Sequence, residues 1–279
     1  MTREEKALIF DVQRFCVHDG PGIRSTVFFK GCNMRCAWCH NPESFSQRPE
    51  LLFRPEKCTA CGACEACPSG AHRRENGSHS FHRENCSGCG VCASLCPNGA
   101  LELSGREMTV EEVMKELRKD DKYYAASGGG VTLSGGEASI WFNFVRELLD
   151  ACKSQGFHTA LETNGLISAE RLEALIPRTD LFLFDCKHTD PEAHLHWTGA
   201  PLQPVLDSLQ ALDRAGAKVI LRCPIIPGVN DGEAHFAALR DIREKYASIQ
   251  QVEVMAYHDI GRGKWQALGR SYACLLYTS

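Results

Sequence analysis

The sequence has no long uninterrupted hydrophobic run. Its most apolar stretch, residues 218–229, is interrupted by Arg222, Pro224 and Pro227, so it is too short and too broken to cross a bilayer. The first fifteen residues, MTREEKALIFDVQRF, lack the apolar centre of a signal peptide. We therefore expect a cytoplasmic protein without a membrane partner.

An excess of positive charge is also missing. The net charge is -4 and the sequence pI is near 6.3, so bulk charge gives no support for nucleic-acid binding. We find no motif that favours hydrolysis or nucleotide binding: neither a Ser-His-Asp set, nor a pair of hydrolytic carboxylates, nor a Gly-Lys-Ser/Thr phosphate loop. With 279 residues and 43% hydrophobic composition, the chain is long enough to bury a sizeable core.

What the sequence has in abundance is cysteine, with 16 residues. Clustered cysteines in a chain without an export signal indicate a reducing compartment and metal binding rather than disulfides. We interpret five scattered cysteines as small apolar residues: Cys16, Cys152, Cys186, Cys223 and Cys274. The other eleven fall into three tight clusters.

Strand and helix patterns alternate along most of the chain. Apolar strands are predicted near residue 26 and at 131–133, 158–162, 181–185, 218–222 and 252–257, with helices over 109–119, 141–155, 168–176, 203–215 and 233–247. Thr109 and Glu112 have the spacing of a capping box at the first of these helices. This order predicts an α/β fold with a parallel sheet, a partial (β/α)6 TIM-like barrel whose chemistry lies at the C-terminal ends of the strands.

The first cysteine cluster, Cys32, Cys36 and Cys39, follows the strand near residue 26. Three thiolates on one short loop can hold three irons of a cubane cluster and leave the fourth iron open to a chelating ligand. The alternative is a zinc site completed by His40 or by a distant residue, because structural zinc takes four ligands.

Residues 58–100 are rich in Cys, Gly and Pro and have almost no periodic segment. Such a stretch cannot bury much apolar surface, so its fold needs another source of stability. We expect a discontinuous barrel domain, 1–49 and 105–273, interrupted by an iron–sulfur insertion at 50–104.

Several ordered motifs resemble the radical S-adenosylmethionine superfamily and, within it, the activating enzymes of glycyl radical enzymes. These motifs stand in the order expected for the family, before, within and after the three-cysteine loop, and the resemblance covers residues 9 to about 272: DGPGIR (19–24), FFKGC (28–32), WCHNPE (38–43), SGGE (134–137), ETNG (162–165), DCK (185–187), LRCPIIPG (221–228) and AYH (256–258).

The resemblance implies a role for each matching site residue. Three cysteines hold the catalytic [4Fe-4S] cluster, and its open iron chelates S-adenosyl-L-methionine. The remaining residues bind that cofactor: Trp38, Cys39 and His40 near the adenine, Gly136 along the methionine, Glu162, Asp185 and Lys187 near the carboxylate, Asp190 and Glu192 near the ribose, and His258 as a further contact. Arg222 is a fixed cation either for the carboxylate or for the partner's loop. In the family, some of these acids act through a monovalent cation. Here the first acid is Glu162, where the best-known members have Asp.

The insertion resembles a two-cluster bacterial ferredoxin, in which the last cysteine of each run completes the cluster of the other run. The resemblance implies two further [4Fe-4S] clusters, one held by Cys58, Cys61, Cys64 and Cys96 and the other by Cys86, Cys89, Cys92 and Cys67. The first run is one residue short before Cys67. A zinc ribbon built from the CxxC pairs remains the alternative.

The resemblance implies an oxidoreductase that cleaves S-adenosylmethionine reductively to a 5′-deoxyadenosyl radical and removes hydrogen from a glycine Cα of a partner enzyme. The Asp19–Gly22 segment is the candidate acceptor of the partner's glycyl loop. It also implies a flavodoxin- or ferredoxin-type electron donor, a monomer and an anaerobic setting.

Three rival hypotheses remain open. The chain could be a radical enzyme acting on another peptide or on a small molecule, an iron–sulfur electron carrier, or a structural zinc protein. The last six residues, Cys274-Leu-Leu-Tyr-Thr-Ser, look foreign, and we expect the natural chain to continue differently from residue 274.

Overall fold

The structure is a computed structural model that describes residues 5–75 and 77–274. Of the six residues suspected to be foreign, 275–279 lie outside the described part and only Cys274 falls within it. Within the described ranges, no helix is both long and apolar enough to cross a membrane.

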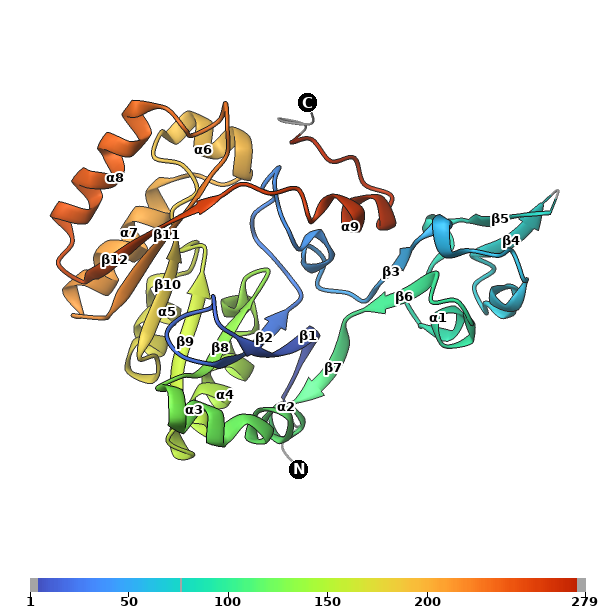
Figure 1. Ribbon diagram of the computed structural model, residues 1–279, viewed down its shortest axis with the longest axis horizontal. Coiled ribbons are helices and arrows are strands. Elements are labelled where there is room, and N and C mark those ends of the chain that lie inside the picture. Colours follow the sequence, from blue (N-terminus) through green and yellow to red (C-terminus); the bar gives the residue numbers. More distant parts are fainter. Residues whose placement is uncertain (1–4, 76, 275–279) are drawn as a thin grey trace.

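One large sheet of eight strands forms the body of the molecule (Figure 1). Its order is β12-β11-β10-β9-β8-β2-β1-β7, and every neighbouring pair from β2 to β12 is parallel. The six parallel strands are β2 (Arg24–Phe29), β8 (Gly130–Gly135), β9 (His158–Thr163), β10 (Leu181–Asp185), β11 (Val219–Ile225) and β12 (Ile249–Ala256). The predicted α/β fold with six parallel strands is therefore confirmed.

Five helices lie where the sequence predicts them, before or between the parallel strands: α2 (Val110–Leu117), α4 (Phe142–Ser154), α5 (Ala169–Leu175), α7 (Gln203–Arg214) and α8 (Glu233–Lys245). Three more were not expected: α3 (Asp121–Ser127), α6 (Pro191–Thr198) and α9 (Arg262–Ala267), which follows β12. The capping box at α2 is present: Glu112 N donates to Thr109 Oγ1 at 3.2 Å, and Thr109 N donates to Glu112 Oε2 at 2.8 Å. A continuous apolar core joins the strands to these helices.

Two antiparallel strands that the sequence did not suggest extend the sheet beyond β2. Strand β1 (Lys6–Cys16) pairs with β2 and with β7 (Arg106–Thr109), the strand that returns from the insertion. Only the first part of β1 is buried, and its second half is mostly exposed. It therefore lacks the regular alternation that marks a half-buried strand in a sequence.

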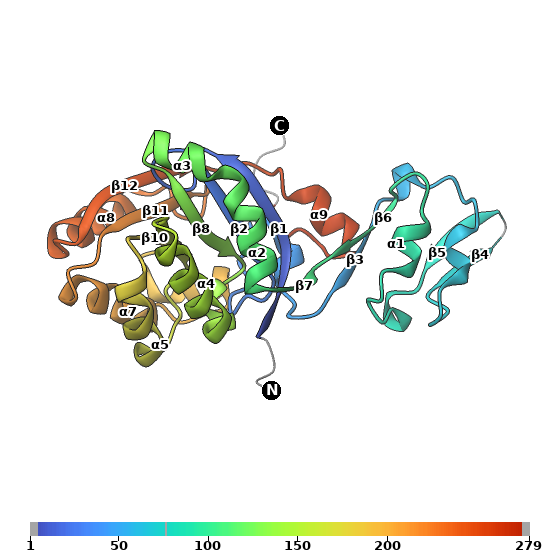
Figure 2. The ribbon, with the colours of Figure 1, turned by 90° about the horizontal axis from the view of Figure 1, so that it is seen from below.

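Residues 50–104 form a small unit that stands away from the large sheet in both views (Figures 1 and 2). It consists of the antiparallel pair β3 (Glu50–Phe53) and β6 (Leu101–Ser104), the hairpin β4 (His72–Glu75) and β5 (Ser78–Phe81), and the short helix α1 (Val91–Leu95). The β4–β5 hairpin lies at the end furthest from the sheet. The main apolar cluster of the unit has four buried residues: Leu51, Cys64, Cys92 and Leu101.

Candidate functional site

A cavity of about 780 Å³ opens at the C-terminal ends of the parallel strands, a size within the usual range for small-molecule sites. Side chains from the three-cysteine loop, from β8 to β12 and from the end of β1 line it. The cavity brings together eleven of the site residues named from the sequence: Cys32, Cys36, Trp38, Cys39, His40, Gly136, Glu162, Asp185, Lys187, Arg222 and His258.

The three-cysteine loop is held by contacts from segments far along the chain. Arg35 N donates to Thr198 O at 2.7 Å, and Ala37 N donates to the oxygen of the neighbouring Trp197 at 3.0 Å. The indole Nε1 of Trp265 donates to Cys39 O at 2.8 Å. These bonds fix the backbone around the thiols independently of any ligand.

Two glycines allow other segments to approach this loop closely. A Cβ at Gly136 would lie 2.2 Å from Gly31 O and 3.0 Å from Cys32 Cβ. A Cβ at Gly261 would lie 2.8 Å from His40 Cα. Packing alone therefore explains the glycine at position 136: the absence of a side chain lets the segment after β8 lie against the backbone that carries Cys32.

The three thiols lie in a buried environment next to one cation. Burial raises the pKa of the Cys32 thiol to about 11 and also raises the pKa of Cys36 and of Cys39. Burial opposes the Lys187 ammonium, but the Asp185 carboxylate and the Cys36 and Cys32 thiols hold the pKa of Lys187 above its ordinary value. Since iron binds thiolates, loading this loop must release protons, and Lys187 favours the charged ligands.

An ion-pair network also lines the cavity. Arg222 Nη1 lies 2.6 Å from Glu162 Oε1, and Arg222 Nε lies 3.3 Å from Glu253 Oε2. Burial raises the pKa of Glu162 although Arg222 opposes the shift. Ser134 Oγ also donates to the Glu162 carboxylate.

Both acids that the resemblance associates with a monovalent cation already have a cation of this chain beside them. Glu162 is paired with Arg222, and Asp185 Oδ2 lies 2.9 Å from Lys187 Nζ. A bound cation would compete with both side chains, so the monovalent cation stays a prediction.

The Asp19–Gly22 segment is anchored at the edge of the same cavity. Thr26 Oγ1 donates to Asp19 Oδ2 and Thr132 Oγ1 donates to Asp19 O, each at 2.7 Å. The fully buried Arg24 donates from Nε to Thr132 Oγ1 at 2.6 Å. Arg222 Nη2 donates to His18 O at 2.8 Å, so Arg222 links the acid network to this segment.

Two histidines meet at the outer rim of the cavity. The rings of His40 and His258 are stacked, with centroids 3.9 Å apart and an interplanar angle of 24°, and His40 Nε2 lies 3.0 Å from His258 O. Trp38, which also lines the cavity, is buried at 5% exposure, with its ring centroid 6.3 Å from that of Trp197. Only the small exposed part of the Trp38 ring could therefore make the contact expected with the adenine.

Asp190 and Glu192 are not part of this cavity. Asp190 Oδ1 accepts a hydrogen bond from Ala193 N at 2.8 Å and caps α6, and Glu192 lies in the first turn of that helix. The local sequence Asp-Pro-Glu is a helix start signal, which gives these residues a structural role.

Sequence reasoning gave no role to Glu137 and Asn164, although both lie in quoted motifs. The fully buried Glu137 carboxylate accepts from Asn164 N at 2.9 Å and from Thr163 Oγ1 at 3.1 Å, and thereby ties the turn after β8 to the end of β9. Asn164 Nδ2 donates to Asn33 Oδ1 at 2.9 Å and reaches the cysteine loop. The available signal was their position directly after a strand.

In the insertion, the eight clustered thiols fall into two groups. Cys64 interacts electrostatically with Cys58, Cys61 and Cys96. Cys92 interacts in the same way with Cys67, Cys86 and Cys89. This grouping has the same members as the crossed sets that the resemblance to a two-cluster ferredoxin implies, with Cys67 in the second group. That each group binds a cluster stays a prediction.

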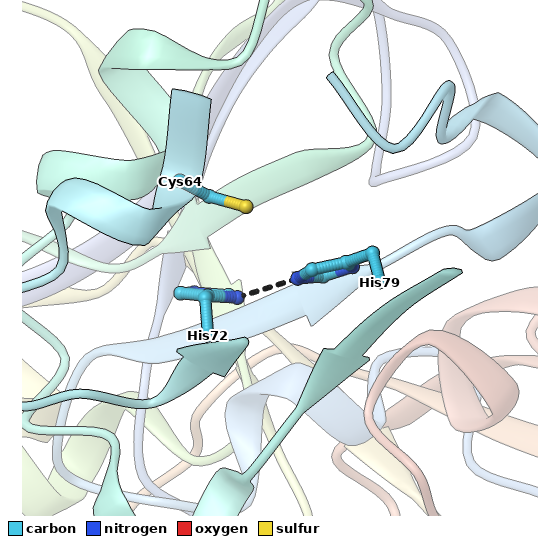
Figure 3. A group of neighbouring side chains, drawn as sticks. All are labelled: Cys64, His72 and His79. Carbon is cyan, nitrogen blue, oxygen red and sulfur yellow. Dashed lines mark hydrogen bonds between the residues drawn. The ribbon is translucent and has the colours of Figure 1, made fainter. Parts of the chain in front are cut away.

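A further group of potential metal ligands lies beside the first set. Cys64, His72 and His79 offer ligand atoms that all lie within 4.8 Å of one another (Figure 3). His72 Nδ1 and His79 Nε2 are 2.9 Å apart. His79 also lines a small cavity together with Cys58, Cys61, Cys64 and Cys96.

Family models match three parts of the sequence. The radical SAM superfamily matches residues 83–239, a 4Fe-4S dicluster domain matches 50–97, and a 4Fe-4S single cluster domain matches 18–61.

Curated relatives match almost the whole chain. The (2S)-3-sulfopropanediol dehydratase activating enzyme of Klebsiella oxytoca is 38% identical over 98% of this chain and 88% of its own length. The benzylsuccinate synthase activating enzyme of Thauera aromatica is 40% identical over 95% of this chain and 82% of its own length.

A solved structure shares the fold. Streptococcus suis SuiB bound to precursor peptide SuiA has a TM-score of 0.53 and 13% identity, over 84% of this chain and 38% of that chain. At that identity the likeness concerns the fold alone.

Proposed function

Because the chain belongs to the radical S-adenosylmethionine superfamily and, within it, to the activating enzymes of glycyl radical enzymes, we propose how its own residues carry out that activity. When bound, the reduced cluster and S-adenosylmethionine supply a 5′-deoxyadenosyl radical that takes hydrogen from a glycine Cα of the partner enzyme. The rest of the proposal concerns which side chains hold, orient and shield these groups.

The observation that carries the proposal is the convergence of three thiols with several charged side chains, Lys187 and Arg222 among them, in one cavity. Cys32, Cys36 and Cys39 would hold the cluster, with one iron left to the cofactor. Lys187, paired with Asp185, faces these thiols and suits the cofactor carboxylate. A low-potential cluster reduces a bound sulfonium efficiently only when both are held in fixed geometry, and the loop's tertiary contacts supply that rigidity.

The other cavity residues would bind the remainder of S-adenosylmethionine. We assign the adenine to the rim formed by Trp38, His40 and His258, and the methionine to the segment at Gly136. Glu162 and Arg222 together form a nearly neutral polar wall. Asp190 and Glu192 are left out of this set because they lie at the start of α6.

The partner's glycine would enter beside Asp19. This segment is fixed to β2 and β8 through Thr26 and Thr132, and Arg222 holds the preceding carbonyl. The glycyl loop of the partner must leave its own site to reach the cavity, so partner opening is part of the proposal.

We also propose the division into a barrel, 1–49 and 105–273, and an insertion, 50–104, whose eight cysteines hold two [4Fe-4S] clusters. Those clusters would pass electrons from a flavodoxin- or ferredoxin-type donor to the cluster of the barrel. We further propose a monomer in the reducing cytoplasm, because clustered cysteines that bind metal need reduced thiols.

The named relatives suggest the range of partner enzymes. They activate a sulfopropanediol dehydratase and a benzylsuccinate synthase. We propose a partner of this broad group, a glycyl radical enzyme that eliminates from or adds to a small organic substrate. Co-occurrence of this gene with one for such an enzyme would identify it.

The direct test is release of 5′-deoxyadenosine. The protein would be reconstituted anaerobically with iron and sulfide, reduced and given S-adenosylmethionine, beside Cys36→Ala and the matched control Cys152→Ala, whose thiol is buried in the core away from the cavity. We expect product from the wild type and from the control, and a loss of more than about 100-fold in Cys36→Ala, because a metal ligand matters at least as much as the residues around it.

The opposite outcomes are equally clear. A wild type that titrates as a three-cluster protein without releasing 5′-deoxyadenosine would make it an electron carrier. Full activity in Cys36→Ala would remove the three-cysteine loop from the mechanism.

A further inference from the structure

The β4–β5 hairpin places His72 and His79 next to Cys64, a member of the first cysteine set of the insertion (Figure 3). His72 and Arg74 lie on one strand, and His79 and Phe81 lie on the other, in register so that their side chains share one face. His79 lines the cavity of Cys58, Cys61, Cys64 and Cys96, whereas His72 does not. The imidazole of His79 is thus the nearer of the two to that site.

The hydrogen bond between His72 Nδ1 and His79 Nε2 needs one acceptor nitrogen, so at least one of the two rings is neutral. Each ring is also packed against an aromatic neighbour: His72 stacks on Phe81 at 4.7 Å, and His79 meets Phe53 edge-on at 4.9 Å, between ring centroids.

Counting protons on the pair shows that one N–H is left over. A neutral imidazole has one donor and one acceptor nitrogen. The bond between His72 Nδ1 and His79 Nε2 uses one donor and one acceptor, so the pair keeps one donor and one acceptor. The two remaining atoms, His72 Nε2 and His79 Nδ1, are buried and have no hydrogen-bond partner among residues 5–75 and 77–274.

An unpaired buried donor is costly, and the sulfur atoms of an iron–sulfur cluster are acceptors. We propose that His72 Nδ1–H donates to His79 Nε2, and that His79 Nδ1–H donates to a sulfur of the cluster held by Cys58, Cys61, Cys64 and Cys96, raising its reduction potential. His79 is then a positioning and tuning residue of this cluster, and His72 fixes its tautomer. The inference rests on the proposed ligand set of the insertion.

A ligand role for the histidines is the competing possibility that the geometry raises. Cys64, His72 and His79 could together hold a single metal ion. Cys64 also belongs with three other thiols, however, and a cubane uses the thiolate of every member of such a set. The hydrogen-bonding role uses all four thiols and both histidines without conflict.

The test is an anaerobic redox titration of the fully reconstituted protein, followed by electron paramagnetic resonance, with iron content measured on the same samples. The variants are His79→Leu, which removes both nitrogens, and His79→Asn, whose amide N–H takes the place of Nδ1–H. His82→Leu is the matched control, because His82 lies in the same insertion but outside the cavity and contacts Glu84 and Ser80.

In His79→Leu we expect one of the three midpoint potentials to become more negative. The ratio of reduced to oxidised cluster at a fixed potential should fall about tenfold, equivalent to about 59 mV for one electron. His79→Asn should restore most of the shift, and His82→Leu should move none of the midpoints. The shifted signal should be the one that Cys61→Ala abolishes.

Three outcomes would overturn the proposal. They are unchanged midpoints in His79→Leu at full iron content, an equal shift in His82→Leu, and loss of one cluster's iron that His79→Asn does not restore, which would make His79 a ligand. Release of 5′-deoxyadenosine by the same samples reports on the barrel site, so failure of the proposed function would be seen separately.

Discussion

The two cysteine-bearing regions of the molecule are built on opposite plans. The three thiols of the barrel lie on a loop whose backbone is held by contacts with distant residues such as Gly136 and Trp265. Of the eight thiols of the insertion, Cys64 and Cys92 belong with Leu51 and Leu101 to its main buried cluster, whereas Cys61 and Cys89 are exposed. The barrel therefore shapes its site before any metal binds, whereas the insertion depends on its clusters for a core.

Removal of iron should separate the two regions most strongly. Anaerobic chelation should leave hydrogen exchange slow in β8 to β11 and speed it by at least about 100-fold across 50–104, because structural metal contributes on the order of 10 kcal/mol to the folding of small metal-dependent domains. Mass spectrometry of peptides from both regions would measure the exchange.

Cys36→Ala, loaded with iron, is the control for that experiment. It lacks a ligand only in the barrel, so its insertion should stay as protected as in the wild type. Slow exchange across 50–104 in the chelated protein would show that the insertion has enough packing of its own, and the contrast between the regions would fail.

A smaller effect should follow when the close contact between Gly136 and the three-cysteine loop is disturbed. In Gly136→Ala the new methyl group would lie 2.2 Å from Gly31 O, so the loop or the end of β8 must shift. We expect a loss of about 1–3 kcal/mol in the free energy of unfolding, typical of overpacking, and roughly tenfold slower release of 5′-deoxyadenosine.

The matched control for Gly136→Ala is Gly232→Ala, because a Cβ at Gly232 would meet no atom within 4 Å and the φ of Gly232 is -83°. Both proteins would be compared by denaturation and by product release. Equal behaviour of the two variants in both measurements would mean that the loop tolerates the displacement and that a glycine at position 136 is not needed to place it.

The sequence allowed the six parallel strands, the capping box at Thr109 and the crowding of polar side chains at the strand ends to be predicted, because each depends on local pattern or on a general rule of parallel sheets. It did not reveal β1, whose pairing with β2 and β7 is a tertiary choice. Nor could it reveal that Glu162 pairs with Arg222, 60 positions away.

The smallest expected effect tests whether the barrel is stable on its own interactions. Asp120 is 1% exposed and accepts from Arg14 Nε at 2.8 Å and from Ser25 Oγ at 2.7 Å, joining the helical segment before α3 to β1 and β2. The hydrogen bond from Arg14 holds the pKa of Asp120 below its usual value. Asp120→Asn should cost about 1–2 kcal/mol at neutral pH, as expected for a hydrogen bond to a charged group.

The pH dependence of that cost has a definite sign. A carboxyl whose folded pKa is depressed stabilises the fold fully above its unfolded value of about 3.9, and this contribution is lost as the pH falls through the folded value. The difference in unfolding free energy between wild type and Asp120→Asn should therefore shrink below about pH 4. All 4 tryptophans lie outside 50–104, so their fluorescence in chelated protein follows the barrel alone.

Glu111→Gln is the matched control for Asp120, because it removes the charge from an exposed ion pair with Arg118 on the neighbouring helix. Exposed pairs contribute little to stability, so this variant should unfold like the wild type at every pH. A constant difference between wild type and Asp120→Asn from neutral pH down to pH values below the folded pKa would assign its cost to packing rather than to charge. The barrel would still form its site before metal binds, but the packing of β1, rather than the charge of the buried carboxylate, would hold that strand in place.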